Sequence, residues 1–250
     1  MRPGHDGGSL MVAPTPTVRM PGGGVSRRPL HFIILADCSG GMKGEKIQAL
    51  NYAIADMMPH LVAWERDQAQ AQIFIRAVAF ATEPRWHIPD PVPVADIRWK
   101  PLQVVPKGLT NMGPAFAMVA EALAPDRIER RALRPALLLI TDGLSTDLPG
   151  RFEHGLATLM AQPAGRAALR LSIAIGRDAQ SEALTQFIGD PSVPVLVANA
   201  TEDIADRLVA ASLAVSRMSE VGADRTAVAR RLFGGPEGAP SGIFDQDTII

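Results

Sequence analysis

Four oxygen-bearing side chains follow the apolar runs of this chain at positions where they would do chemistry together: Asp37, Ser39, Thr110 and Asp142. The first two directly follow the run HFIILA, the last follows ALLLIT, and the threonine lies in the loop KGLTNMG. Carboxylates and hydroxyls are hard ligands, which suit Mg²⁺ or Mn²⁺ better than softer metals. The sequence therefore predicts a divalent-cation site if these loops meet.

The elements that must position these side chains alternate along the chain. Continuous apolar runs indicate strands buried on both faces, and the helical segments between them predict a mostly parallel sheet with helices on both sides. Many prolines in 85–99 suit an edge strand and loops. The expected strand segments are 31–36, 71–81, 135–141, 168–176 and 193–198, and the expected helical segments are 47–61, 113–123, 152–160, 181–189 and 202–218.

This alternation predicts an α/β fold of the Rossmann-like, doubly wound kind, with six strands, one of them an antiparallel edge strand. In such sheets ligands bind beyond the carboxyl ends of the strands, where the strand order reverses. The loops that follow Ala36, Ile140 and Gly176 are therefore the expected place for chemistry. Within the first helix, Pro59 is expected to kink or split the helical run.

Three separated motifs, DCSGGM, GLTNMG and LLLITDGLSTD, resemble the metal-ion-dependent adhesion site (MIDAS) of von Willebrand factor A (vWA) domains. That family has the pattern Asp-x-Ser-x-Ser, a distant Thr, and an Asp often followed by Gly. The resemblance covers about 31–218 and is nearest to the bacterial TerY-like branch. It implies that Ser39 and Thr110 contact the ion directly, while Asp37 and Asp142 act mainly through water. The chain departs from the pattern at Gly41, which replaces the second serine and leaves a ligand position for water.

The resemblance implies a binding module and not an enzyme. The cation would capture an Asp or Glu side chain of a partner protein. TerY-like proteins are associated with tellurium resistance and stress response, beside a protein kinase and a metal-dependent protein phosphatase. Two alternatives stay open: a metal-dependent phosphohydrolase that uses Asp37, and a degenerate vWA domain, marked by Gly41, that binds partners without metal.

Composition excludes several function classes. The formal net charge is −1 and no basic patch stands out, so we expect no nucleic-acid partner. The single cysteine, Cys38, permits no intramolecular disulfide, and no apolar run reaches membrane-spanning length, so a cytoplasmic protein without a membrane segment is expected. Gly- and Pro-rich composition predicts disordered tails over 1–29 and 221–250 around a vWA domain at 30–220.

Simpler roles compete for several of these residues. Asp37 alone would serve as a cap for the following turn, and Cys38 has no matched base, which favours a small buried residue over a nucleophile. The stretch GGMKGEK lacks the Gly-Lys-Ser/Thr ending of a phosphate-binding loop. Asp147 is expected to cap the next helix, with a supporting role at the site as the alternative, and Asn111 is expected to bond to loop backbone.

Overall fold

A computed structural model of the chain describes residues 27–67, 70–176, 182–200 and 203–218. Most of the expected N-terminal tail and the whole expected C-terminal tail lie outside the described residues. The first strand begins at Arg28, so it includes the last two residues of the predicted N-terminal tail. In the described part of the chain, no helix is both long enough and apolar enough to cross a membrane.

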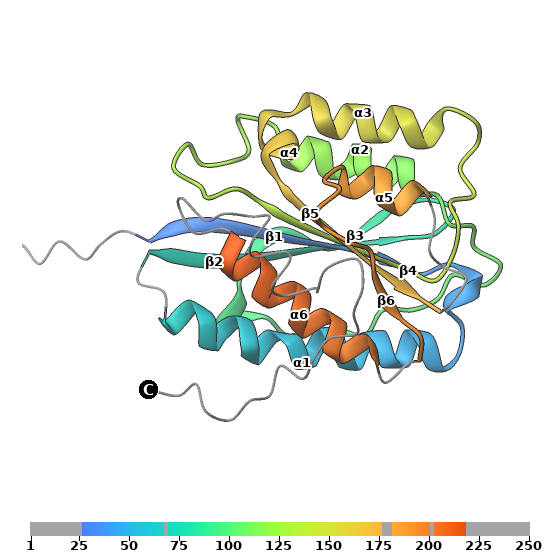
Figure 1. The fold of residues 1–250 in the computed structure, drawn as a ribbon, viewed down its shortest axis with the longest axis horizontal. Coiled ribbons are helices and arrows are strands. Elements are labelled where there is room, and N and C mark those ends of the chain that lie inside the picture. The colour runs from blue at the N-terminus through green and yellow to red at the C-terminus, as the bar shows by residue number, and fades with distance from the viewer. Residues whose placement is uncertain (1–26, 68–69, 177–181, 201–202, 219–250) are drawn as a thin grey trace, which may run out of the picture.

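The protein is built on one six-stranded sheet with the strand order β3-β2-β1-β4-β5-β6 (Figure 1). Only β3 is antiparallel to its neighbour; the other pairs are parallel. The strands are β1 (Arg28–Asp37), β2 (Ala71–Phe80), β3 (Arg85–Pro93), β4 (Ala136–Thr141), β5 (Leu169–Ile175) and β6 (Leu196–Ala198). The predicted doubly wound sheet with one antiparallel edge strand is confirmed.

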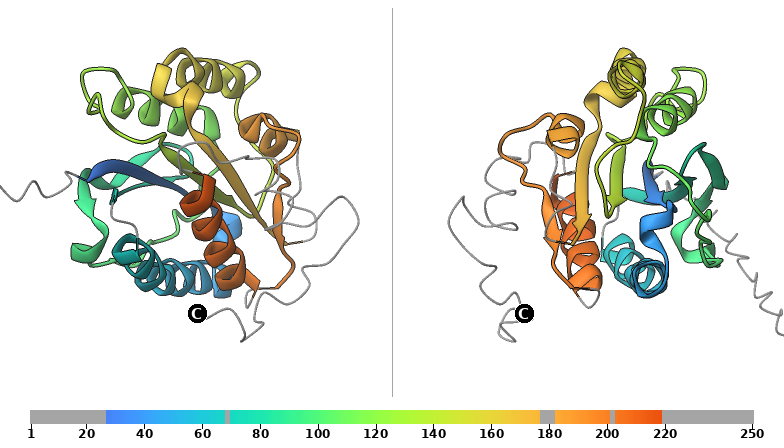
Figure 2. Two further views of the ribbon diagram at one scale, coloured as in Figure 1. Left: turned by 60° about the vertical axis from the view of Figure 1, so that its left-hand side comes forward. Right: turned by 90° about the vertical axis from the view of Figure 1, so that its right-hand side faces the viewer.

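The helices lie in two layers, one on each face of the sheet (Figures 1 and 2). One layer holds α1 (Glu45–Asp67) and α6 (Asp203–Met218). The other layer holds α2 (Met112–Ala122), α3 (Arg151–Ala161), α4 (Pro163–Ala167) and α5 (Glu182–Ile188). Two short 3₁₀ turns, Gly40–Met42 and Val94–Asp96, complete the described elements.

Strand β1 explains why the sheet is covered on both faces. Phe32 and Ile34 face a core built with α1 and α6, whereas Ile33 and Leu35 face a second core built with α2, α3 and α5. Successive side chains of a strand point to opposite faces, so an uninterrupted apolar run requires a helix layer on each side. The sheet edge where β1 ends is thereby fixed by packing on two sides.

Helix α1 continues through Pro59, so the expected split does not occur. The proline lies on the exposed face of the helix. Its neighbours Met57, Met58 and Leu61 are buried against the sheet, and this packing maintains the helix despite the missing backbone donor.

Candidate metal centre

The strand order reverses between β1 and β4, which are neighbours in the sheet although they are far apart in the chain. Asp37 is the last residue of β1, and Asp142 follows Thr141, the last residue of β4. Two of the predicted carboxylates therefore lie at the switch point of a doubly wound sheet, where ligands bind in such folds.

The Asp37 carboxylate is buried, and both of its oxygens accept hydrogen bonds. Its Oδ1 accepts from the backbone N–H of Ser39 at 2.7 Å, and its Oδ2 accepts from the Thr141 hydroxyl at 2.6 Å. The first bond is the two-residue turn expected of an aspartate at this position. Asp37 thus both caps the turn and fixes the loop on which Ser39 stands.

Burial raises the pKa of the Asp37 carboxyl above its ordinary value, and the negative charge of Asp142 acts in the same direction. Hydrogen bonds from Thr141 and from Ser39 oppose this rise. The two carboxylates are close enough to repel, so a positive charge between them would relieve that repulsion.

The loop that carries Thr110 packs directly on the turn after β1. Gly40 donates its N–H to the Gly108 carbonyl at 3.0 Å, and Val105 donates to the Cys38 carbonyl at 2.8 Å. Ser39 and Thr110 are both buried, at 2% and 7% exposure. These contacts bring the two predicted hydroxyl ligands to the same edge of the sheet as the two carboxylates.

Asp142 approaches the turn at the position of the missing serine. A Cβ placed on Gly41 would lie 2.9 Å from each of the Asp142 carboxylate oxygens, which is closer than real Cβ contacts. The Asp142 side chain, only 6% exposed, forms an ion pair with Lys46 through its Oδ2. This lysine stands at the start of α1, and the sequence motifs do not predict it as part of the site.

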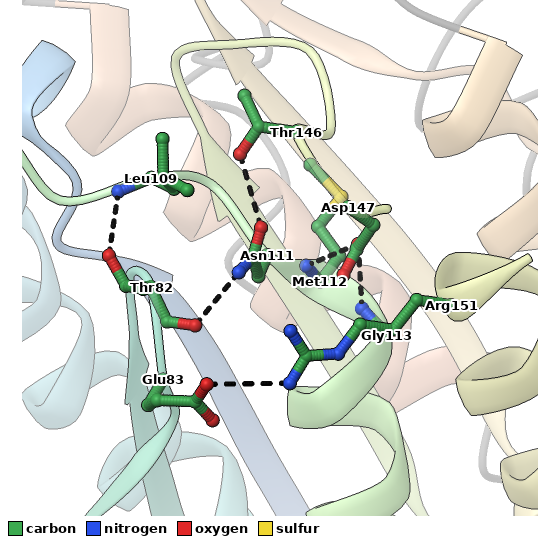
Figure 3. A network of polar contacts seen from close by, with 9 residues as sticks. All are labelled: Thr82, Glu83, Leu109, Asn111, Met112, Gly113, Thr146, Asp147 and Arg151. Atoms are coloured by element: carbon green, nitrogen blue, oxygen red, sulfur yellow. Dashed lines mark hydrogen bonds and ion pairs between the residues drawn. The ribbon is translucent and has the colours of Figure 1, made fainter. Parts of the chain in front are cut away.

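A network of polar contacts joins the residues around Thr110 to the loops that follow β2 and β4 (Figure 3). Asp147 Oδ2 accepts the N–H groups of Met112 and Gly113 at 2.8 and 2.9 Å, so it caps the N-terminus of α2. Asn111 donates to the Thr82 carbonyl at 2.8 Å, as expected of a loop-backbone contact. The expectation that Asp147 caps the next helix is wrong, because the loop folds back toward α2 before α3 begins.

The same network joins the Thr110 loop to the loop after β4. Thr146 donates its N–H to the Thr110 carbonyl at 3.0 Å, and its hydroxyl accepts the N–H of Thr110 at 2.7 Å. Two loops separated in the sequence by α2 and β4 are therefore joined by a pair of hydrogen bonds. These bonds hold Thr110 next to the segment that begins with Asp142.

The donor set fits a hard cation only in part. No group of three or more His, Cys, Asp or Glu side chains able to hold a metal occurs in the described ranges. Two hydroxyls and two carboxylates remain, which suits an ion that keeps several waters. Against this, Gly41 supplies no side-chain oxygen, and Asp142 is already paired with an ammonium.

No model of a protein family and no curated protein matches the chain. Solved structures are similar in fold. A von Willebrand factor type A protein from Catenulispora acidiphila superposes with a TM-score of 0.58 at 16% identity, over 76% of this chain and 43% of that one. The proximal thread matrix protein 1 of the mussel byssus, solved with a zinc-occupied MIDAS motif, gives 0.55 at 17% identity, over 74% and 48%.

The fold is that of a vWA domain. The PilB minor pilin from Streptococcus sanguinis is also similar, with a TM-score of 0.58 at 13% identity, over 78% of this chain and 63% of the pilin. This chain spans less than two thirds of each of these three proteins. The similarity to vWA domains is confirmed at the level of the fold, while the TerY-like branch stays a prediction.

Proposed function

We propose that this vWA-type chain is a non-enzymatic protein-interaction module whose sheet edge holds a divalent cation, Mg²⁺ or Mn²⁺. Ser39 and Thr110 would bind the ion directly, and Asp37 and Asp142 would bind it mainly through water. The bound ion would supply positive charge for an Asp or Glu side chain of a partner protein. The observation that carries the proposal is the meeting of these four residues at the switch point of the sheet.

Exposed apolar side chains around this edge support an interaction role. Three of the exposed large hydrophobic residues stand on its loops: Leu109 at 48% exposure, Leu144 at 60% and Leu148 at 70%. Exposed leucines beside a polar site are typical of surfaces that bind proteins, because a partner can bury them.

The resemblance to the TerY-like branch suggests the setting. We propose a scaffold or regulatory role in a stress-response system, with a protein kinase or a metal-dependent protein phosphatase as the partner that contributes the acidic side chain. This step rests on analogy with the family and on no contact in the molecule.

The phosphohydrolase alternative is less well supported. Asp37 is fully buried and its two oxygens accept hydrogen bonds from Ser39 and Thr141, whereas a nucleophilic carboxylate must reach its substrate. An assay with an aryl phosphate and Mg²⁺ tests it: turnover that disappears in Asp37→Asn would replace the binding proposal with an enzymatic one.

A display selection with random peptides tests the binding proposal. We expect selection on the immobilised chain in Mg²⁺ to enrich peptides that contain Asp or Glu, and we expect chelator to release them. Ser39→Ala and Thr110→Ala should abolish the enrichment, whereas Thr158→Ala, at a half-buried position in the second half of α3, should not change it. Peptides bound equally well in chelator would instead support the alternative of a metal-independent vWA domain, which Gly41 and the Lys46 ion pair favour.

A further inference from the structure

The Lys46–Asp142 ion pair joins two elements that lie far apart in the chain. Lys46 is the second residue of α1, and Asp142 begins the loop after β4, so the pair crosses the edge where the sheet order reverses. The carboxylate end is almost fully enclosed, at 6% exposure, while the lysine side chain is 38% exposed. An ammonium therefore sits on the carboxylate that the proposed cation would use.

Gly41 makes this arrangement possible. Because a Cβ on residue 41 would lie 2.9 Å from both Asp142 oxygens, any side chain there would require the end of the Asp142 side chain to shift from its present position. The glycine thus removes a potential ligand and also admits the position in which Asp142 meets Lys46. The glycine at position 41 and the ion pair between Lys46 and Asp142 are therefore parts of one local arrangement.

The Lys46 ammonium offsets negative charge at this edge of the sheet. Asp37 and Asp142 place two carboxylates at this edge, both with little access to water. Buried carboxylates without a nearby positive charge destabilise a folded protein. Lys46 supplies one positive charge to this cluster in the absence of a metal ion.

A groove in the surface lies next to the Lys46 side chain. It has a volume of about 520 Å³ and is lined by Lys43, Lys46, Gly176 and Asn199 among others. Ion pairs with a partly exposed partner are weak, and a divalent ion attracts a carboxylate more strongly than an ammonium does. The partly exposed Lys46 side chain lines this groove, so an ammonium released from Asp142 would face solvent there and not the core.

We propose that Lys46 is the resident cation of this site: its ammonium competes with a divalent ion for Asp142 and must be displaced before metal engages that carboxylate. The inference rests on the proposed function, because it concerns the same site. It predicts a site whose metal affinity is set by an internal competitor and not by the ligand set alone.

Calorimetric titration with Mn²⁺ of the whole chain tests the competition. Lys46→Met keeps the length of the side chain and removes its charge, and we expect it to bind Mn²⁺ about tenfold more tightly than the unaltered chain. Lys43→Met is the matched control, because Lys43 is exposed and lines the same groove, and it should leave the affinity unchanged. Equal affinities for Lys46→Met and the unaltered chain, including no binding by either, would overturn the inference.

A measurement on the unaltered chain avoids any folding defect of the variant. Acetylation of lysines, followed by mass spectrometry, reports how free each ammonium is. Addition of Mg²⁺ should increase the labelling of Lys46 and leave that of Lys43 constant. Labelling of Lys46 that does not respond to millimolar Mg²⁺ contradicts displacement.

The two proposals fail in different ways. If Lys46→Met gains Mn²⁺ affinity but no acidic peptide is enriched, the proposed function fails and the competition stands. If Ser39→Ala abolishes both metal binding and peptide enrichment while Lys46→Met changes neither, the competition fails and the proposed function stands.

Discussion

Asp147 caps a helix that precedes it in the sequence: its Oδ2 accepts the backbone N–H of Met112, the first residue of α2, at 2.8 Å. The residue at the usual cap position, Asn111, makes no side-chain bond to the helix and binds the Thr82 carbonyl instead. The loop after β4 is thereby joined to the N-terminus of α2, directly behind Thr110.

Replacement of Asp147 should destabilise the fold through this cap. Asp147→Ala leaves the N–H groups of Met112 and Gly113 without their acceptor and removes a negative charge from the N-terminus of α2. We expect the free energy of unfolding to fall by about 2 kcal/mol, measured by urea denaturation. Asp56→Ala, an exposed aspartate within α1, is the control, and we expect a change of less than about 0.5 kcal/mol. Equal effects for the two variants would show that the cap contributes nothing.

Helices α2 and α3 approach each other through two glycines. A Cβ on Gly155 would lie 2.0 Å from the Gly113 carbonyl oxygen, and one on Gly113 would lie 2.2 Å from the Arg151 carbonyl oxygen. Alanine normally stabilises a helix relative to glycine by about 1 kcal/mol. Here the added methyl group meets backbone atoms that have no side-chain freedom with which to yield.

We therefore expect the ordinary effect to be reversed in Gly155→Ala. The free energy of unfolding should fall by about 3 kcal/mol or more, which would be seen as a lower midpoint in thermal or urea unfolding. Gly143→Ala is the comparison, because a Cβ on Gly143 would lie 4.0 Å from the nearest atom it meets, the Thr110 hydroxyl oxygen. A Gly155→Ala protein as stable as the unaltered chain would mean that the helices do not pack this closely.

Local sequence patterns were sufficient to predict the sheet. The apolar run of β1 and the alternation of Ile73 and Ile75 against Val78 and Phe80 in β2 correspond to burial against two helix layers, which is a local property of each strand. The prolines of β3 predicted the edge, because proline cannot donate to a second neighbour. Helix α4 was missed, since a segment of five residues carries no helical period.

The site was predictable only as a set of residue types. Asp37, Ser39, Thr110 and Asp142 follow strand ends or lie in loops, which the pattern indicates. The Lys46–Asp142 pair spans 96 positions, and nothing in the sequence around Lys46 distinguishes it from a solvated surface lysine. The bond from Thr141 to Asp37, 104 positions apart, depends in the same way on the register of β1 against β4.

Cys38 should behave as an inert thiol at neutral pH. It is 1% exposed, and burial, with a smaller contribution from the charge of Asp37, raises its pKa from 9.0 to about 12. In the unfolded chain the thiol ionises near its ordinary pKa, so the folded state is relatively disfavoured as the pH rises from about 9 toward 12. We expect ionisation of this thiol in the unfolded chain to lower the free energy of unfolding by about 1.4 kcal/mol at pH 10.

Comparison with Cys38→Ala isolates this effect from other groups that titrate in alkali. The difference in unfolding free energy between the two proteins, measured at pH 8 and pH 10, should shrink by that amount at the higher pH. A thiol reagent at neutral pH should modify Cys38 only at the rate of unfolding. Rapid modification of the folded chain would contradict the burial of this side chain.

Gly41→Ser restores the hydroxyl that vWA domains carry at this position, and it should have two opposite effects. Its Cβ would come within 2.9 Å of both Asp142 oxygens, so the carboxylate must move away from its present place beside Lys46. We expect a lower thermal midpoint in chelator, because an enclosed carboxylate loses its ion pair. With Mn²⁺ present, the added oxygen ligand should raise the metal affinity above that of the unaltered chain, measured by calorimetry.

Gly40→Ser provides the matched control for this change. It adds the same side chain one residue earlier, where the three atoms nearest the new Cβ are backbone atoms of Lys107 and Gly108 at 3.4 to 3.6 Å. Its metal affinity should therefore equal that of the unaltered chain. If Gly41→Ser binds Mn²⁺ no better than Gly40→Ser, residue 41 does not face the ion and the assignment of Ser39 and Thr110 as its ligands is wrong. If both chelator-treated variants melt together, Asp142 does not rest against residue 41, and the charge arrangement inferred for Lys46 loses its structural basis.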